Sequence, residues 1–201
     1  MFSSSSPFDE SGDLERVQKE FSQAGKRYLS SPWSWLVWAI VLPSAALATR
    51  SLVGRVPPPA ILILWSVAIL VGGAVEGLLI FRRTSEQAGS GLTRWVFRAQ
   101  GNISLVAVAL SIILVWQGLA WILPGLWLLL LGHSFFLMGG LAFGPLRISG
   151  IVYQTGGLLA LWPGGETLIV FSIATAAANL WMGWAVWQHR RGARDKVLPQ
   201  P

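Results

Sequence analysis

The run PAILILWSVAILVGGAVEGLLIFRR, residues 59–83, decides the fold class of this chain. Its residues 59–81 are almost all apolar and lead directly into Arg82 and Arg83. A helix of about 20 apolar residues crosses the ~30 Å hydrocarbon layer of a bilayer, and basic residues collect at its cytoplasmic end. The run therefore predicts a transmembrane helix that ends at the cytoplasmic surface.

Similar apolar runs lie on both sides of this one. The predicted spans are residues 33–52, 59–81, 94–116, 121–143, 146–163 and 167–188. The chain is 53% hydrophobic and only 12% charged, whereas soluble domains carry about 25% charged residues. We therefore expect an all-α fold, a polytopic bundle of six transmembrane helices.

The basic residues fix the orientation of this bundle. With six spans, one side holds Arg16, Lys19, Lys26, Arg27, Arg82, Arg83, Arg94, Arg98, Arg147, Arg190, Arg191, Arg194 and Lys196. The opposite side holds only Arg50 and Arg55. By the positive-inside rule, both termini are predicted to be cytoplasmic.

Three regions follow along the chain. Residues 1–32 form a cytoplasmic tail, residues 33–188 the transmembrane domain, and residues 189–201 a basic cytoplasmic tail. Within the first tail, Leu14, Val17, Phe21 and Tyr28 share one helical face, which predicts an amphipathic helix before the first span. Such a helix either lies on the lipid headgroups or docks a cytoplasmic partner.

The chain contains 12 tryptophans, and many fall near the ends of the predicted spans. The inner set is Trp33, Trp35, Trp95, Trp184 and Trp187, and the outer set is Trp65, Trp116, Trp121 and Trp162. This distribution is typical of the aromatic belts at membrane surfaces. The alternative is a stacking platform for a pigment or another aromatic ligand.

Glu76 is the acidic residue inside a predicted span, about one turn from the inner end of its helix. Arg98 lies about one turn into the next helix from the same side. Adjacent antiparallel helices predict an ion pair between them, which either clamps the hairpin or forms a proton or ion site. Arg98 could instead extend its charge to the headgroups.

A second polar group lies nearer the middle of the bilayer. It comprises His133, Gln154 and Asn179 from three consecutive helices, with Asn102 somewhat nearer one surface. These side chains predict an interhelical hydrogen-bond network, with transport as an alternative role. His133 is also a candidate ligand for haem or for a chlorophyll-type pigment.

Pairs of small residues four apart predict close helix packing. They are Gly73 and Gly77, Gly140 and Gly144, and Ala174 and Ala178. This spacing lets helix backbones approach each other, either within the bundle or against another subunit.

Catalysis and soluble functions find little support in the residues. The chain has no cysteine, no metalloprotease or serine-hydrolase motif, and no phosphate-binding loop. We therefore expect no enzyme activity, no metal site and no nucleic-acid partner.

The stretch ILPGLWLLLLGHSFFLMGGLAFGPLRISGIVYQTGGLLAL (122–161) and the helix DLERVQKEFSQAGKRYLS (13–30) resemble a family of uncharacterised six-helix bacterial membrane proteins. In ANLWMG (178–183), Asn179 stands where that family has histidine. The resemblance implies a protein of the bacterial cytoplasmic membrane. Family members often accompany winged-helix regulators, which implies a role as a membrane partner or sensor.

Long apolar faces, small-residue pairs and scarce charge inside the spans favour one class of function. We expect a non-catalytic membrane protein that acts through helix contacts, as an accessory or structural subunit of a larger membrane assembly. The alternatives are a small transporter or channel, a sensor partner of a transcription regulator, and a haem- or pigment-binding subunit.

Overall fold

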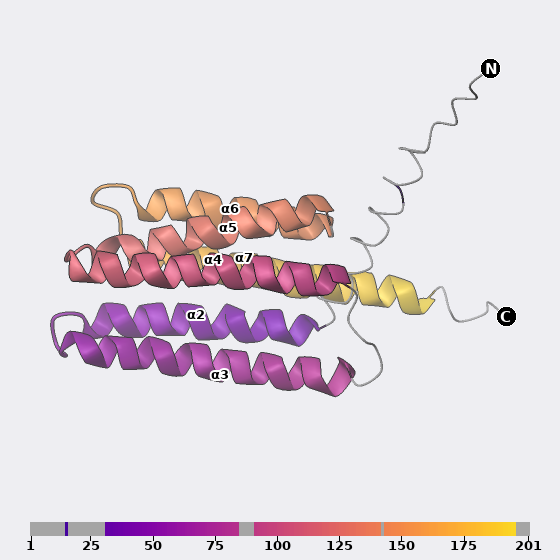
Figure 1. Cartoon of the computed structure of the whole chain (residues 1–201), viewed down its shortest axis with the longest axis horizontal. Helices are drawn as coiled ribbons and strands as arrows, with labels where there is room; N and C mark the ends of the chain where they lie inside the picture. The colour runs from indigo at the N-terminus through magenta and orange to yellow at the C-terminus, as the bar shows by residue number, and fades with distance from the viewer. Residues whose placement is uncertain (1–14, 16–30, 85–90, 142, 196–201) are drawn as a thin grey trace, which may run out of the picture.

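The structure is a computed structural model that describes residues 15, 31–84, 91–141 and 143–195 (Figure 1). Within these residues it is all helical, with six α-helices, one short 3-10 turn and no strand. The elements are α2 (Pro32–Leu52), α3 (Pro58–Thr84), α4 (Gly91–Trp116), η1 (Ala120–Ile122), α5 (Leu123–Leu141), α6 (Gly144–Ala160) and α7 (Thr167–Asp195).

Proline and glycine set several helix boundaries. α2 and α3 begin at Pro32 and Pro58, and proline is well suited to a first helical turn because its φ angle is already fixed near the helical value. The connections that follow α2, α4 and α6 each contain a glycine with φ between 73° and 78°, namely Gly54, Gly118 and Gly164. Only glycine adopts this left-handed conformation without cost, so these residues allow the chain to reverse direction.

The helices run antiparallel along the long axis, and α2 begins at the end of the bundle where α7 finishes (Figure 1). Each expected apolar run corresponds to one helix, so the helical fold class is confirmed. The expected domain boundary at residue 188 falls inside α7, which continues to Asp195. The expected amphipathic helix over 13–30 lies outside the described residues, apart from helical Glu15.

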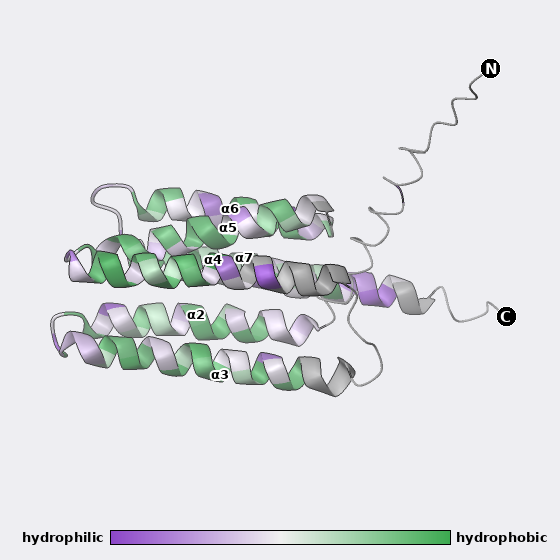
Figure 2. Ribbon diagram, viewed as in Figure 1, coloured by the Kyte–Doolittle hydropathy of each residue, from purple (hydrophilic) through white to green (hydrophobic). Residues whose placement is uncertain are grey.

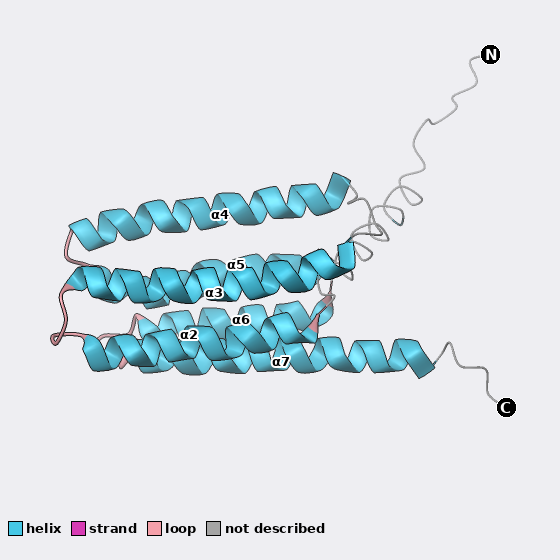
Figure 3. Cartoon of the chain, turned by 90° about the horizontal axis from the view of Figure 1, so that it is seen from below, coloured by secondary structure: helices cyan, strands magenta, loops and turns pink. Residues whose placement is uncertain are grey.

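α7 holds the centre of the bundle, packed against α2 on one side and α6 on the other. One cluster of buried residues joins α2, α5, α6 and α7 around Tyr153, Leu128 and Phe171. A second cluster, nearer the other end, contains Leu146, Met182 and Val186. α3 packs mainly against α2, and α4 mainly against α5 and η1. α3 lies at the lower edge of the bundle in Figure 1, and α4 lies at the upper edge in Figure 3.

The closest helix pair is α5 with α6, and glycines seven residues apart make it close. Gly125, Gly132 and Gly139 line one side of α5, and Gly150 and Gly157 face them from α6. A Cβ atom on Gly132 would lie 2.8 Å from the backbone nitrogen of Gln154, and one on Gly150 would lie 2.5 Å from that of Phe136. Because glycine has no side chain, the backbones of α5 and α6 come into direct contact at these positions.

Apolar residues cover the outside of the helices as well as the inside (Figure 2). Four helical segments of the described chain are long and apolar enough to cross a membrane: 32–52, 58–79, 120–140 and 167–192. The apolar part of α4, Gly101–Trp116, and the 17-residue α6 are shorter. Soluble monomers rarely expose so much apolar surface, and these helices are consistent with a membrane protein.

Candidate functional site

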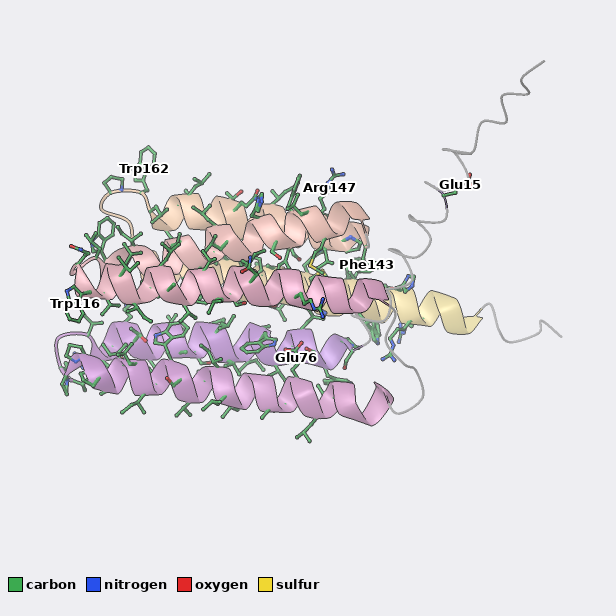
Figure 4. The ribbon with its side chains drawn as sticks, in the orientation of Figure 1. Glu15, Glu76, Trp116, Phe143, Arg147 and Trp162 are labelled. Atoms are coloured by element: carbon green, nitrogen blue, oxygen red, sulfur yellow. The ribbon has the colours of Figure 1, made fainter. Side chains whose placement is uncertain are left out.

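Glu76 lies between α2 and α3, where it accepts two hydrogen bonds from α2 (Figure 4). Ser34 Oγ donates to Oε1 at 3.0 Å, and Trp38 Nε1 donates to Oε2 at 3.0 Å. Ser34 and Trp38 are four residues apart, so they share one face of α2. Gly72 makes room for the indole, because a Cβ atom there would lie 2.7 Å from the Trp38 ring.

The structure does not bring Glu76 and Arg98 together. Arg98 is exposed on α4, whereas the hydrogen bonds of Glu76 come from Ser34 and Trp38 of α2. The physical reason lies in the packing order, because α3 packs mainly on α2 while α4 packs mainly on α5. Consecutive helices are usual neighbours, but here the second and third spans separate.

Asn179 forms a buried polar contact where α6 meets α7. Its Nδ2 donates to Tyr153 Oη at 2.8 Å and to the Thr175 carbonyl at 2.7 Å. Asn179 and Tyr153 are each only 2% exposed. A second bond crosses the same interface, from Ser149 Oγ to the Ala178 carbonyl at 3.1 Å. This group fixes how α6 and α7 pack, and it presents no accessible atom to a substrate.

The expected network of Asn102, His133, Gln154 and Asn179 is not assembled. His133 and Asn102 are exposed on α5 and α4, and Gln154 is half-buried over Gly132. Within the described part of the chain, none of these three side chains has a hydrogen-bond partner. Similar depth along a bundle does not place side chains on facing sides of their helices.

The predicted small-residue pairs have different surroundings. Ala174 and Ala178 are buried on α7, and Ala174 touches the place where Gly156 lacks a side chain. A Cβ atom on Gly73, Gly77, Gly140 or Gly144 would instead meet no atom within 4 Å. These four glycines therefore face out of the bundle, and its close contacts use the seven-residue glycine spacing of α5 and α6.

Two matching contacts lie toward the end of the bundle where α2 finishes and α3 begins, and neither was among the predicted sites. Trp65 Nε1 donates to Thr49 Oγ1 at 2.9 Å, and this hydroxyl donates to the Ala45 carbonyl. In the next hairpin, Trp127 Nε1 donates to Ser111 Oγ at 3.0 Å, and this hydroxyl donates to the Ala107 carbonyl. In each pair the tryptophan and the hydroxyl residue are 16 positions apart in the chain. This repeated spacing could have indicated the contacts from the sequence.

Several tryptophans project outward at the ends of the helices. Trp116 is 89% exposed, and Trp162 is 72% exposed at the same end of the bundle (Figure 4). At the opposite end, the Arg191 guanidinium lies 3.7 Å from the centroid of the Trp187 ring. Trp35 and Trp65 instead pack on the core clusters. The side chain of Trp95 lies outside the described residues.

Arg50 and Glu166 join the end of α2 to the start of α7. Arg50 Nε lies 3.1 Å from Glu166 Oε2, and Nη2 lies 3.3 Å from Oε1. The hydrogen bond from Arg50, and then its positive charge, hold the pKa of Glu166 below its ordinary value. The pair is exposed, so water weakens the attraction.

We expect this pair to make the stability of the bundle depend on pH. Because the folded pKa of Glu166 is depressed, its contribution is present above the ordinary value and is lost as pH falls through the folded value. Glu166→Gln should lower the melting temperature slightly at neutral pH, and the difference from the unchanged protein should vanish in strong acid. Arg55→Gln is the control, because Arg55 has no ion pair in the described structure. A difference that persists in acid would contradict the prediction.

No group of three or more histidine, cysteine, aspartate or glutamate side chains is close enough to hold a metal ion within the described residues. His133 stands alone on the exposed side of α5, so binding of haem or pigment there stays a prediction. Comparison with known proteins gives no match to a family model, to a curated protein or to a solved structure. Function is therefore argued from the chain's own packing.

Proposed function

We propose that this chain is a six-span membrane protein, with both termini on the cytoplasmic side, that serves as a non-catalytic subunit of a larger membrane assembly. The antiparallel order of the helices supports this topology, because α2 begins and α7 ends at the same end of the bundle (Figure 1). Arg147, Arg190 and Arg191 lie toward that end, and Arg50 and Arg55 lie toward the other. This distribution agrees with the positive-inside rule.

The proposed contact with another subunit is the face of α3 that points away from α2. α3 packs mainly against α2, and its remaining surface includes Leu70, which is 70% exposed, and the open glycines Gly73 and Gly77. Glycine at a lipid-facing position offers almost no side chain for lipid to cover. Two such glycines, four residues apart, favour close packing by another helix, with backbone against backbone.

The polar contacts support a structural role. Glu76 is engaged by Ser34 and Trp38, and Asn179 by Tyr153, so each of these polar groups holds two helices together. Asn102 and His133 are both exposed on the outside of their helices, so they do not line a common cavity. The alternative of a transporter built on Glu76 and His133 has no contact between them to support it.

We expect leucine at Gly73 and Gly77 to remove a partner without disturbing the chain itself. Neither glycine has a neighbouring atom within 4 Å of a new Cβ, so the bundle accommodates both side chains. After gentle detergent extraction, native mass measurement should find the unchanged protein with at least one different polypeptide. The double variant Gly73→Leu/Gly77→Leu should lose that polypeptide.

Val71→Phe is the matched control, because Val71 is also exposed on α3 but points about 160° away from Gly73 and about 120° away from Gly77 around the helix. This variant should keep the partner. A particle of the unchanged protein that contains only this chain would overturn the proposed function. Loss of the partner in all variants alike would show that the glycine face is not the contact.

A further inference from the structure

α4 is less enclosed than the helices at the centre of the bundle. It packs mainly against α5 and η1, and Ala107 is the one buried residue among its described side chains. Figure 3 shows α4 set apart from α2, α6 and α7. Its attachment uses the side that carries Ala107 and Ser111, where Trp127 of α5 donates to the serine hydroxyl.

Most described residues of α4 are exposed, and a stripe can be defined along the side opposite Ala107. Its members, spaced alternately four and three residues apart, are Arg98, Asn102, Leu105, Ala109, Ile112 and Trp116. At 100° per residue, this α4 stripe centres on the side of the helix opposite Ala107 and Ser111. A period of 3.5 residues is that of helices that wind around each other along one seam.

Asn102 is the residue of the α4 stripe whose side-chain amide finds no hydrogen-bond partner in lipid chains. It is exposed, and within the described residues its side chain has no hydrogen-bond partner. It lies 14 positions before the end of α4, about 21 Å from that end, which is inside the hydrocarbon layer of the proposed topology. An amide without a partner in hydrocarbon is costly, so this side chain calls for another polar group.

We propose that the α4 stripe binds the α4 stripe of a second copy of this chain, with the two Asn102 amides hydrogen-bonded to each other. Two copies inserted with the same topology place their α4 helices parallel, so a twofold axis brings each residue opposite itself. Asparagine suits this arrangement because its amide both donates and accepts, and a single buried asparagine fixes the register of paired helices. Small Ala109 allows close approach, and the long stem of Arg98 carries its charge to the lipid phosphates.

This pairing rests on the membrane placement proposed above but uses a different face from the α3 contact. Single cysteines provide the test, because the chain has none of its own. Leu105→Cys and Ile112→Cys lie on the stripe, and Leu110→Cys is the matched control, because Leu110 is exposed but points more than about 130° away from both around the helix. In liposomes, oxidation should link the two stripe variants into dimers of twice 21.8 kDa and leave the control as monomer.

Asn102→Leu in the Leu105→Cys background should lower the linked fraction about threefold to tenfold at a fixed protein-to-lipid ratio, as expected for loss of a hydrogen bond between membrane helices. Asn102→Gln keeps an amide and should retain most of the linkage. Equal linkage at Leu110, linkage only to a polypeptide of another mass, or none at all would each overturn the pairing. The native mass of the α3 variants is read separately, so either proposal can fail without the other.

Discussion

Gly150→Val is expected to force α5 and α6 apart and to destabilise the bundle by about 3 kcal/mol, at the upper end of the usual range for overpacking. The new Cβ atom would lie 2.5 Å from the Phe136 nitrogen, 2.8 Å from the Phe136 Cα and 2.8 Å from the Gly132 carbonyl oxygen. All three neighbours are backbone atoms, so no side chain can rotate away. The two helices must separate along their length, and the contacts at Gly125 and Gly157 loosen as well.

The measurement is thermal unfolding in a mild detergent, followed by tryptophan fluorescence. Gly140→Val is the matched control, because Gly140 lies on α5 and a Cβ atom there has no neighbour within 4 Å. We expect the control to melt close to the unchanged protein and Gly150→Val to melt far below it. Equal losses in the two variants would show that valine acts through helix propensity, and that α5 and α6 are not in backbone contact.

Asn179→Ala is expected to lower the free energy of unfolding by about 2 kcal/mol. The change leaves the Tyr153 hydroxyl buried without its donor, and an unsatisfied buried polar group costs about 1–3 kcal/mol. Values for single hydrogen bonds in bilayers are smaller, about 0.6–1.7 kcal/mol, so the cavity left by the amide supplies the remainder.

Tyr153→Phe tests this interpretation in a double-mutant cycle. Alone it should cost less than Asn179→Ala, since the amide still donates to the Thr175 carbonyl. With both changes the loss should be smaller than the sum, because no unpaired hydroxyl remains. Gln154→Leu is the control, and we expect it to have little effect because that amide has no partner among the described residues. Additive losses would mean that Asn179 and Tyr153 act independently.

The helices themselves could be predicted from the sequence, because a long apolar run bounded by proline, glycine or charge has few alternatives in lipid. The run 59–81 became α3, and its predicted start lies within one residue of Pro58. The predicted span 167–188 lies within α7, which continues to Asp195, because basic residues mark the membrane surface and do not by themselves end a helix.

The partners of individual side chains could not be predicted in the same way. The order of spans suggested that Glu76 would meet Arg98, but the neighbour of α3 is α2, and its donors there are Ser34 and Trp38. Serine and tryptophan are common in membrane helices, so nothing in the sequence marked these two residues as partners of Glu76. The seven-residue glycine spacing in α5 is present in the sequence, but the prediction of close packing used the pairs spaced four residues apart. Only the rotation of each helix about its axis decides which glycines face a neighbour.

The fit between α5 and α6 also bears on how the protein is made. α6 has 17 residues and contains serine, glutamine and threonine, so by itself it enters lipid less readily than the leucine-rich α5. Next to α5 its backbone is covered at Gly150 and Gly157, so in the proposed topology this part of the peptide backbone is shielded from lipid. We therefore expect the translocation machinery to hold α5 until α6 emerges from the ribosome, and to release the two into the bilayer together as a preassembled hairpin.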